Sequence, residues 1–360
     1  MRLALISLLM IPLANGCGEA KSSGDGTPEF PQDGDSDGIL ADDDCDDSDP
    51  NSTSVATDGD CDGVVTDSDC DDNDATIFPG APETLDDGID HDCDGGDDVT
   101  CYGDYEIEIA ADLEALKYCA EITGSLTNPN PNFGSDLDSL DGLENLITIE
   151  GSLSLEATKI QDLDGLQNLT SVGGDLLLLG NKSLRNVDGL SNLRHVGQDL
   201  TIINSEALEH IDGLTNLTTI GRSLFLVNLP IASIDDLANL NSVGKDLTLD
   251  TLPSIPDIDS LSKLTGVDEL RLKDLDQIEH LDGLMNLTSV GDVLFVTGNE
   301  RLKSIDAITD LTTINTDIYV RIAGNDELCQ SDVDALRAFL MTLGWSGGGD
   351  LDFNENNDSC

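Results

Sequence analysis

A phrase of about 24 residues recurs through the C-terminal part of the chain and strongly limits how that part can fold. The tripeptide Asp-Gly-Leu, or a close variant of it, returns at intervals of 23 or 24 residues. Its eight copies begin at Asp141, Asp164, Asp188, Asp212, Asp235, Asp259, Asp282 and Asp306. Repeats of this length stack on one another, because a single copy cannot bury its own apolar face. The spacing therefore predicts a solenoid of about eight turns.

Each turn also contains a short stretch in which aliphatic residues alternate with other residues, a pattern typical of a strand with one buried face. The aliphatic positions are Leu153 and Leu155, Leu176 and Leu178, Leu200 and Ile202, Leu224 and Leu226, Leu247 and Leu249, Leu270 and Leu272, Leu294 and Val296, and Ile318 and Val320. One strand per turn, stacked on the next, gives a parallel sheet. The predicted fold class is therefore mainly β, a parallel β solenoid.

Helical caps are expected to close the solenoid, because its end turns would otherwise expose apolar residues. Four apolar residues near the C-terminus recur at helical spacing: Leu336, Phe339, Leu340 and Leu343. Ser331 and Asp334 have the spacing of a capping box at the start of this helix. Gly344 is expected to end the helix, and Trp345 is expected to pack within the cap.

Negative charge is concentrated between residues 33 and 98. That segment contains 25 acidic residues and no lysine or arginine, whereas residues 101–360 contain 45 acidic and 14 basic residues. The change predicts a domain boundary near residue 100, with metal-binding repeats over 33–98 and the capped solenoid over 99–360. The whole chain has a formal charge of −57, which would repel the phosphates of nucleic acids and anionic lipids. We therefore exclude nucleic acid as a partner.

The acidic segment contains a repeated sequence. Residues 33–51 match residues 58–76 at 11 of 19 positions, and a third, partial copy spans residues 90–95. All copies contain Asp-x-Asp-x-Asp-Gly, in which alternate carboxylates can converge on one hard cation while the glycine permits the turn. The predicted ligands are Asp33, Asp35, Asp37, the carbonyl of Ile39, and Asp44; Asp58, Asp60, Asp62, the carbonyl of Val64, and Asp69; and Asp90, Asp92 and Asp94. Oxygen-only ligands favour calcium, and the alternative is a solvated, disordered acidic spacer.

The N-terminus and the cysteines indicate export. Residues 3–13 form an apolar run after Arg2, which is typical of a signal peptide and too short to span a membrane. An exported chain meets oxidising conditions, so eight of the nine cysteines are expected to form disulfides. These are Cys45, Cys61, Cys70, Cys93, Cys101, Cys119, Cys329 and Cys360. Sequence proximity favours the pairs Cys101–Cys119 and Cys329–Cys360, and leaves the other four open.

Two N-terminal segments resemble known bacterial motifs. Ala14-Asn15-Gly16-Cys17 resembles a lipobox, which implies a signal peptide over 1–16, lipidation of Cys17 and a flexible tether over 17–32. The run from Asp33 to Gly95, with its PGAPE and DHDCDG elements, resembles the metal-binding repeat of MopE-type bacterial surface proteins and thrombospondin type 3 calcium repeats. The MopE resemblance implies copper, but this segment offers only His91 and cysteines expected in disulfides. We therefore predict calcium, with copper as the alternative.

Residues 101–360 resemble the receptor L-domain, the solenoid of growth-factor receptor ectodomains and of many bacterial and fungal surface proteins. The resemblance rests on the eight turns and on the opening sequence CYGDYEIEIAADLEALKYCAEITGSL. The repeat length is that of leucine-rich repeats, although the spacing after each strand differs from their consensus. The resemblance implies a right-handed, leucine-rich-repeat-like coil and a role in ligand recognition or wall organisation. It is weaker for function than for fold, because one fold hosts many functions.

Outward-facing residues of the predicted strands form two groups that could contact a protein or glycan ligand. The apolar group comprises Leu177, Leu179, Ile203, Phe225 and Val227, and exposed apolar patches often mark contact surfaces. The basic and aromatic group comprises Arg271, Lys273, Phe295, Tyr319 and Arg321. The turn at Val267 is one residue short and lacks its glycine, so irregular backbone is expected there. The alternative explanation of the apolar group is β-propensity or cover by a loop, and that of the basic and aromatic group is local charge balancing.

Together these features predict a non-enzymatic lipoprotein of the bacterial cell envelope, held by its N-terminal lipid at the outer membrane or cell surface. A calcium-binding stalk would present the solenoid for recognition or adhesion. A structural envelope protein cross-linked through calcium is the alternative. The chain contains no metalloprotease, P-loop, Rossmann or nucleophile-elbow motif. The remaining enzyme alternative is a calcium-dependent polysaccharide lyase with Arg271 and Lys273 as bases.

Overall fold

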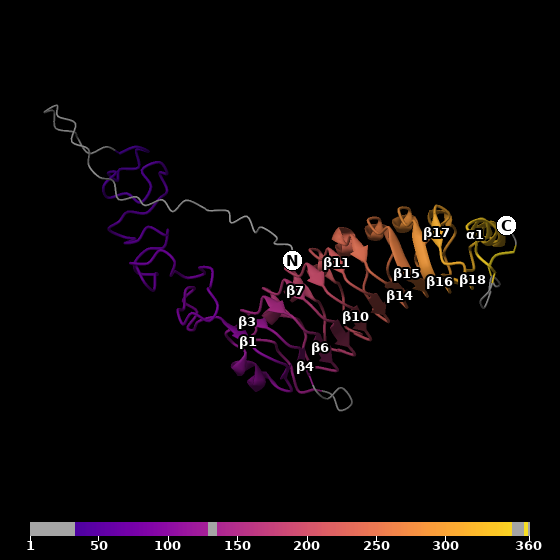
Figure 1. The fold of residues 1–360 in the computed structure, drawn as a ribbon, viewed down its shortest axis with the longest axis horizontal. Helices are drawn as coiled ribbons and strands as arrows, with labels where there is room; N and C mark the ends of the chain where they lie inside the picture. The colour runs from indigo at the N-terminus through magenta and orange to yellow at the C-terminus, as the bar shows by residue number, and fades with distance from the viewer. Residues whose placement is uncertain (1–32, 129–134, 348–355, 359–360) are drawn as a thin grey trace, which may run out of the picture. The chain divides into compact units, whose positions relative to one another are not determined.

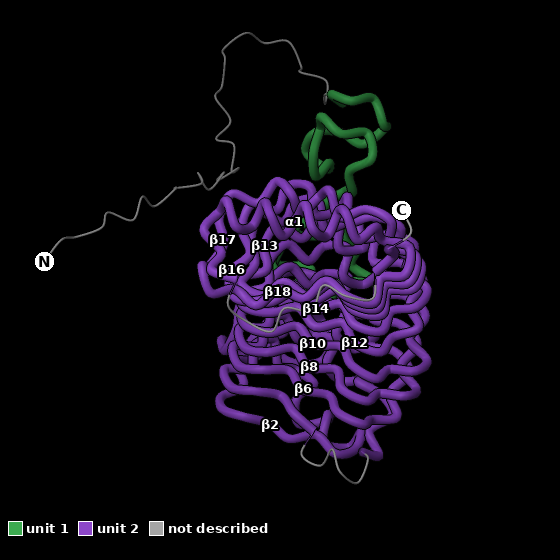
Figure 2. The backbone as a smooth tube through the Cα atoms, turned by 90° about the vertical axis from the view of Figure 1, so that its right-hand side faces the viewer, with its two compact units in different colours: residues 1–79 green, residues 80–360 purple. Residues whose placement is uncertain are grey.

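The computed structural model describes residues 33–128, 135–347 and 356–358. Contacts between residues divide the chain into two units, 1–79 and 80–360 (Figure 2), and each is described by itself. The predicted signal peptide, the tether, Cys17 and Cys360 lie outside the described residues. Within the described ranges, no helix is long and apolar enough to cross a membrane.

The second unit is a stack of coils built on two parallel sheets, which confirms the predicted β solenoid (Figure 1). A seven-stranded sheet contains β1 (Val99–Cys101), β3 (Cys119–Ile122), β5 (Thr148–Ile149), β7 (Ser171–Val172), β9 (His195–Val196), β11 (Thr219–Ile220) and β13 (Ser242–Val243). An eleven-stranded sheet contains β2 (Tyr105–Glu106), β4 (Leu126–Thr127), β6 (Leu153–Glu156), β8 (Leu176–Leu179), β10 (Leu200–Ile203), β12 (Leu224–Val227), β14 (Asp246–Asp250), β15 (Gly266–Lys273), β16 (Ser289–Thr297), β17 (Thr313–Ile314) and β18 (Tyr319–Ala323). The second sheet carries the strands predicted from alternation.

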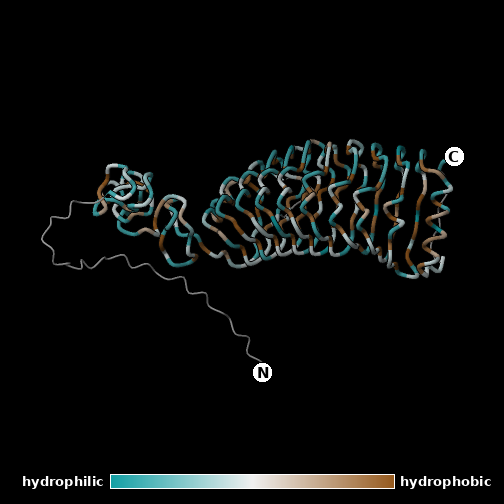
Figure 3. Tube along the Cα trace, turned by 90° about the horizontal axis from the view of Figure 1, so that it is seen from above, coloured by the Kyte–Doolittle hydropathy of each residue, from teal (hydrophilic) through white to brown (hydrophobic). Residues whose placement is uncertain are grey.

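Aliphatic side chains fill the interior of the coils. Equivalent residues pair in register from coil to coil, as in Leu176, Leu200 and Leu224. Every aliphatic residue predicted to face inward is at most 1% exposed. Apolar positions therefore recur at the same place in successive coils (Figure 3). Burial of about 25 cal/mol per Å² of apolar surface is the main force that holds such a stack together.

The recurring Asp-Gly-Leu phrase forms one turn of 3₁₀ helix in seven of its eight copies, whereas the first copy, at Asp141, forms a simple turn. The turns are η2 (Asp164–Leu166), η3 (Asp188–Leu190), η4 (Asp212–Leu214), η5 (Asp235–Asn239), η6 (Asp259–Leu261), η7 (Asp282–Leu284) and η8 (Asp306–Ile308). Adjacent turns approach closely, since a Cβ atom on Gly189 would lie 1.7 Å from the carbonyl oxygen of Leu163. Glycine is needed at such a position because a side chain would displace the neighbouring backbone.

A left-handed residue ends each main strand and turns the chain into the next side of the coil. These residues are Ala157, Gly180, Asn204, Asn228, Thr251, Asp274, Gly298 and Gly324, with φ between +51° and +69°. In three coils the next residue is a fully buried asparagine: Asn181, Asn299 or Asn325. The asparagine amides donate to carbonyl oxygens at the strand ends, for example Asn325 Nδ2 to Val296 O at 3.0 Å. They thereby satisfy polar backbone groups that the corner would otherwise bury without a partner.

The first coil is capped by η1 (Ala110–Ala115) and closed by the predicted Cys101–Cys119 disulfide. The last coil is capped by α1 (Gln330–Thr342), followed by Gly344 at φ +99°. The indole nitrogen of Trp345 donates to the carbonyl oxygen of Ile318 at 3.0 Å, which confirms the cap position of Trp345. The predicted capping box is wrong, because the N-cap of α1 is Cys329, two residues before Ser331, and it makes no side-chain capping bond.

The predicted irregularity near Val267 is present. In most earlier coils two separate strands, one in each sheet, are joined by a corner. In the coils of β15 and β16, one unbroken strand covers the places of both. The pairing of these strands shifts in register between Val267 and Glu269. The missing residue therefore straightens the corner, and the outer face of the sheet changes shape at β15, β16 and β18.

Candidate metal centres

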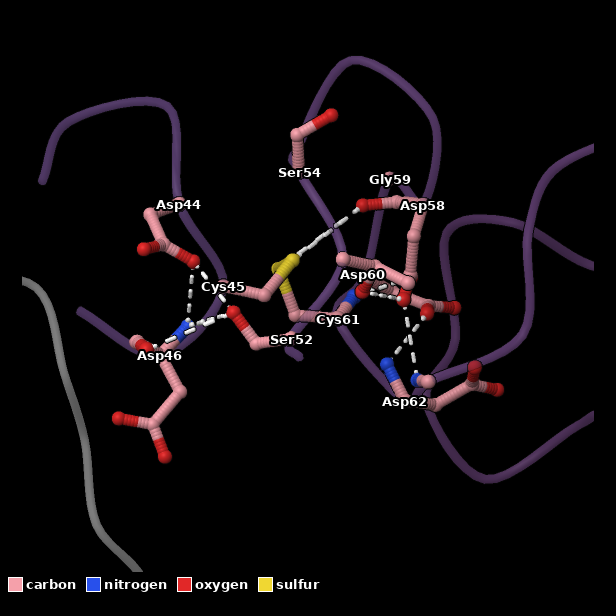
Figure 4. The surroundings of a disulfide bond; sticks show 12 residues. Asp44, Cys45, Asp46, Ser52, Ser54, Asp58, Gly59, Asp60, Cys61 and Asp62 are labelled. Carbon is pink, nitrogen blue, oxygen red and sulfur yellow. Dashed lines mark hydrogen bonds between the residues drawn. A yellow bond between two sulfur atoms is a disulfide. The ribbon is translucent and has the colours of Figure 1, made fainter. Parts of the chain in front are cut away.

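The first unit consists of acidic loops with very little regular structure. A disulfide joins Cys45, just after the first loop, to Cys61, within the second (Figure 4). A single antiparallel bridge pairs Asp44 with Ser54. Cys70, Cys93 and Cys329 are also disulfide-bonded. Cross-links and short hydrogen bonds therefore take the place of an apolar core in this unit.

The three Asp-x-Asp-x-Asp-Gly loops adopt one conformation. The first aspartate of each loop accepts a hydrogen bond from the backbone N–H of the glycine five residues later: Asp33 from Gly38, Asp58 from Gly63 and Asp90 from Gly95, at 3.0 to 3.2 Å. The fourth residue of each loop is left-handed: Ser36, Cys61 and Cys93 have φ of +68°, +65° and +63°. The glycines themselves have φ between +100° and +113°. This backbone folds each loop around its own carboxylates.

The first two loops bring together their three alternating aspartates, which occupy positions 1, 3 and 5 when the loop is counted from its first aspartate. Carboxylate oxygens of Asp33, Asp35 and Asp37 lie within 4.8 Å of one another, and so do those of Asp58, Asp60 and Asp62. One oxygen of each carboxylate at position 3 accepts a backbone N–H, as Asp60 does from Asp62 at 3.3 Å. The other oxygen, Oδ2 of both Asp35 and Asp60, is buried without a hydrogen-bond partner. Unpartnered oxygens that converge in this way are suited to a cation.

Asp44 and Asp69, the predicted ligands at position 12 of the first two loops, also have a buried oxygen without a hydrogen-bond partner. In both residues this oxygen is Oδ2. Desolvation raises the pKa of Asp35 above its ordinary value, and the nearby charges of Asp37 and Asp44 raise it further. Desolvation and the nearby charges of Asp62 and Asp69 have the same effect on the pKa of Asp60.

Asp58 is the most buried carboxylate of the second loop, with no exposed surface. Burial alone would raise its pKa, but hydrogen bonds from Thr53 and from the backbone of Gly63 and Cys61 outweigh the desolvation and lower the pKa. Asp58 therefore stays charged inside the loop and serves as its structural centre. The predicted carbonyl ligands sit at position 7, where the N–H groups of Ile39 and Val64 donate to Asp37 and Asp62 at 2.7 Å.

The third loop has a different set of ligands from the one predicted. Its cluster comprises Glu83, Asp90 and Asp92. Asp94 lies outside the cluster, because its Oδ2 accepts a hydrogen bond from Asn145 Nδ2 at 2.8 Å. Glu83 comes from the PGAPE element ahead of the loop, which was noted in the sequence but not assigned a ligand. Its only signal in the sequence is that Glu83 is the one glutamate of residues 33–98.

His91 lies beside this third cluster rather than in it. Its Nδ1 is 3.5 Å from Glu83 Oε2, and its Nε2 is 3.8 Å from Asp87 Oδ2. The ligands in all three clusters of the described residues are therefore carboxylate oxygens. Such donors suit hard cations, whereas copper prefers imidazole and sulfur.

The predicted ligand face lies on the outside of the eleven-stranded sheet. Leu177 and Phe225 flank Thr201 in register, and Leu179 and Val227 flank Ile203. The five apolar residues of this group, Leu177, Leu179, Ile203, Phe225 and Val227, are half-buried. They form a continuous apolar strip along β8, β10 and β12.

The basic and aromatic group is partly neutralised by neighbouring acids. Arg271 stacks on the ring of Phe295 at 4.8 Å and bonds to Glu269 at 2.7 Å. Lys273 pairs with Asp250 and Asp274 at 3.1 and 3.0 Å. Arg321 lies opposite Phe295 in the pairing of β16 with β18.

Beside this group the outer face is hollowed into a cavity of about 570 Å³. Its walls are formed by Glu269, Arg271, Asp292, Val293, Phe295, Asn315, Asp317 and Tyr319. Tyr319 is 52% exposed, and Asp292 Oδ1 accepts a hydrogen bond from Asn315 Nδ2 at 3.0 Å. The sequence did not predict Asp292, Asn315 or Asp317, because Asp292 lies at the straightened corner within β16 and the other two lie between β17 and β18.

Comparison with known proteins agrees with the acidic clusters. Residues 44–67 and 69–98 match a family model, Cu-binding MopE, whose description is "putative metal-binding motif". No curated protein matches the chain. The two matched segments hold the second and third clusters, together with Asp44, the last predicted ligand of the first loop. The acidic segment is thus similar to this motif, and the motif and the carboxylate clusters together mark the chain as a metal-binding protein.

Proposed function

We propose that this protein is a non-enzymatic, lipid-anchored protein of the bacterial cell surface, in which calcium-loaded acidic loops form a stalk for a recognition solenoid. The observation that carries the proposal is the set of three carboxylate clusters, each of which contains at least one buried oxygen without a hydrogen-bond partner. Bound cations would neutralise these charges and order the loops. The lipobox-like N-terminus supports export and anchoring.

Calcium is the cation that the donors favour. Each cluster presents only carboxylates, and backbone carbonyls at position 7 can complete a six- to eight-fold oxygen shell. Magnesium requires tighter octahedral geometry and retains its water, and copper would need nitrogen or sulfur ligands. The name of the family model suggests copper, so the test must compare copper binding with calcium binding.

The test is isothermal titration of calcium, magnesium and copper into the oxidised full chain. We expect three calcium ions to bind, with Kd of about 10⁻⁴ to 10⁻³ M, as in other extracellular modules. Asp60→Asn should weaken one of the three sites at least tenfold, because the amide removes a charge and an inward oxygen. Asp67→Asn changes an exposed aspartate of the same segment and should leave all three unchanged. Tighter binding of copper than of calcium would refute the assignment.

Recognition by the solenoid is supported by the cavity beside Tyr319. It combines an exposed aromatic ring with carboxylate, amide and guanidinium groups, a mixture suited to a protein or glycan ligand. Binding would be sought on a glycan array and in a random-peptide display library, and the best binder remeasured with variants. We expect Tyr319→Ala to weaken it at least tenfold. Tyr102→Ala removes an equally large exposed ring, 75% exposed, at the other end of the solenoid and should have no effect.

A polysaccharide lyase is the less favoured alternative for the same face. A lyase base must be neutral when it abstracts a proton. Hydrogen bonds to Asp274 and Asp250 raise the pKa of Lys273, and Arg271 is bonded to Glu269. Both candidate bases therefore remain protonated. Release of unsaturated sugars from acidic polysaccharides, followed by ultraviolet absorbance, would reverse this judgement.

A structural envelope protein, cross-linked to its neighbours through calcium, is the other alternative. Cross-linking needs cations shared between molecules, whereas the three carboxylates of each cluster here come from one chain. Treating whole cells with a chelator separates the two. A structural protein would be released from the surface, whereas a lipid-held receptor would stay.

A further inference from the structure

The third cluster belongs to the solenoid unit, whereas the first two belong to the unit before it. We propose that a cation bound by Glu83, Asp90 and Asp92 is a structural part of the N-terminal end of the solenoid, so that this site alone couples calcium to the stability of the solenoid. The inference rests on the proposed calcium binding. It adds that one of the three sites stabilises the solenoid.

Direct contacts join the third loop to the first coils. Asn145 Nδ2 donates to both Asp94 Oδ2 and Asp98 Oδ1, each at 2.8 Å. The hydroxyl of Tyr118 donates to the carbonyl oxygen of Gly95 at 3.1 Å. These bonds hold Asp94, Gly95 and Asp98, which follow Asp92 in the chain, so a movement of the end of the loop would break contacts made by the solenoid.

The backbone continues this connection. The N–H of Val99, the first residue of β1, donates to the carbonyl oxygen of Tyr118 at 2.7 Å. The Tyr118 ring lies against the loop, since a Cβ atom on Gly96 would come within 2.8 Å of it. The loop, β1 and the start of β3 are therefore packed as one piece.

The ligands of this cluster are buried more deeply than a solvated carboxylate can be without a partner. The Glu83 side chain is only 7% exposed. Its Oε1 accepts the backbone N–H of Asp92 at 2.6 Å, while its Oε2, like Oδ1 of Asp90, is buried with no hydrogen-bond partner. Among the described residues, the ion partner of Glu83 is His91. A buried carboxylate oxygen that lacks a hydrogen-bond partner and lies among like charges is stabilised by a bound cation.

Binding to the native state alone raises the melting temperature of the unit that contains the site. At a calcium concentration about a hundred times Kd, linkage predicts a rise of about 5 to 10 °C for a unit of this size. Clusters one and two lie in the other unit, so their occupancy should not move this transition.

The experiment is thermal unfolding of the oxidised full chain in calcium and in a chelator, followed by tryptophan fluorescence. Trp345 is the only tryptophan of the chain, and it is buried in the far cap of the solenoid at 4% exposure, so the signal reports that unit. We expect the wild type to melt about 5 to 10 °C higher in calcium. Glu83→Gln should abolish the rise, and the matched variant Asp60→Asn should keep it.

The melting temperature in chelator distinguishes a ligand from a structural side chain. Gln at position 83 can still accept the Asp92 N–H and removes an unneutralised charge, so Glu83→Gln should melt at or above the wild type in chelator. A lower value would show that Glu83 acts through packing alone and would overturn the inference. An unchanged wild-type melting temperature, or an equal loss of the rise in Asp60→Asn, would also overturn it. If titration shows no calcium bound at any site, the proposed function itself fails.

Discussion

Replacing Asn325 by alanine is expected to lower the free energy of unfolding of the solenoid by about 4 kcal/mol. The side chain has no exposed surface. Its Oδ1 accepts hydrogen bonds from the backbone N–H and from Nδ2 of Asn299, both at 3.1 Å. Its Nδ2 donates to Val296 O at 3.0 Å and to Asn356 Oδ1 at 3.2 Å. Alanine would leave at least the Asn299 N–H and the Val296 carbonyl buried without a partner, at about 1–3 kcal/mol each.

The measurement is chemical denaturation of the full chain in calcium, followed by Trp345 fluorescence and circular dichroism. Asn241→Ala is the matched control, because Asn241 is exposed in a corner of the same solenoid; its loss should change the free energy of unfolding by less than about 0.5 kcal/mol. Equal stability of Asn325→Ala and Asn241→Ala would mean that water replaces the missing amide and that the buried asparagines do not hold the corners.

Replacing Asp98 by asparagine is expected to stabilise the calcium-free solenoid at neutral pH. Desolvation is the main cause that raises the pKa of Asp98 from 3.8 to about 6, and the charges of Asp92 and Glu83 add to it. The hydrogen bond from Asn145 lowers the pKa and so offsets part of this shift. The folded state thus binds the proton more tightly than the unfolded state. Its contribution to stability is fully present below pH 3.8 and is lost as the pH rises through about 6.

An asparagine side chain keeps an acceptor for Asn145 without the charge. The gain at pH 7 should therefore approach about 3 kcal/mol, the linkage value of a shift of this size, and should vanish near pH 4. Melting temperatures in chelator between pH 4 and 8 provide the measurement. Asp138→Asn, at an exposed site of the same unit, should show no such trend. A lower melting temperature for Asp98→Asn at pH 7 would show that the charge itself holds the third loop.

The coils could be predicted closely because their rules are local. Each strand needs only alternation, and each turn needs only the spacing of its Asp-Gly-Leu phrase, so inward residues such as Leu200 and Leu224 were placed correctly. The buried asparagines were not predicted. Asn181, Asn299 and Asn325 each follow a glycine in the sequence, but their side chains face inward only because that glycine is left-handed.

The metal clusters also differ in how far the local sequence predicts them. In the first two loops the ligands sit within five residues of one another, so Asp33, Asp35 and Asp37 converge through the conformation of one short segment. In the third loop, Glu83 reaches the cluster from outside and Asp94 is drawn away by Asn145, a residue 51 positions later. Contacts between distant segments determine whether Glu83 and Asp94 belong to the cluster. The sequence of the loop alone cannot predict such contacts. The start of helix α1 was predicted wrongly for a related reason, because the backbone of Cys329 pairs with that of Asn357.

The Cys101–Cys119 disulfide has a mechanical consequence. A pull on the chain from its N-terminal side would reach the solenoid at β1, whose last residue is Cys101. The covalent bond would pass this load directly to Cys119, the first residue of β3. The 18-residue separation between the two cysteines, which includes η1, would carry no tension. The first coil can therefore transmit force into the stack without being peeled from it.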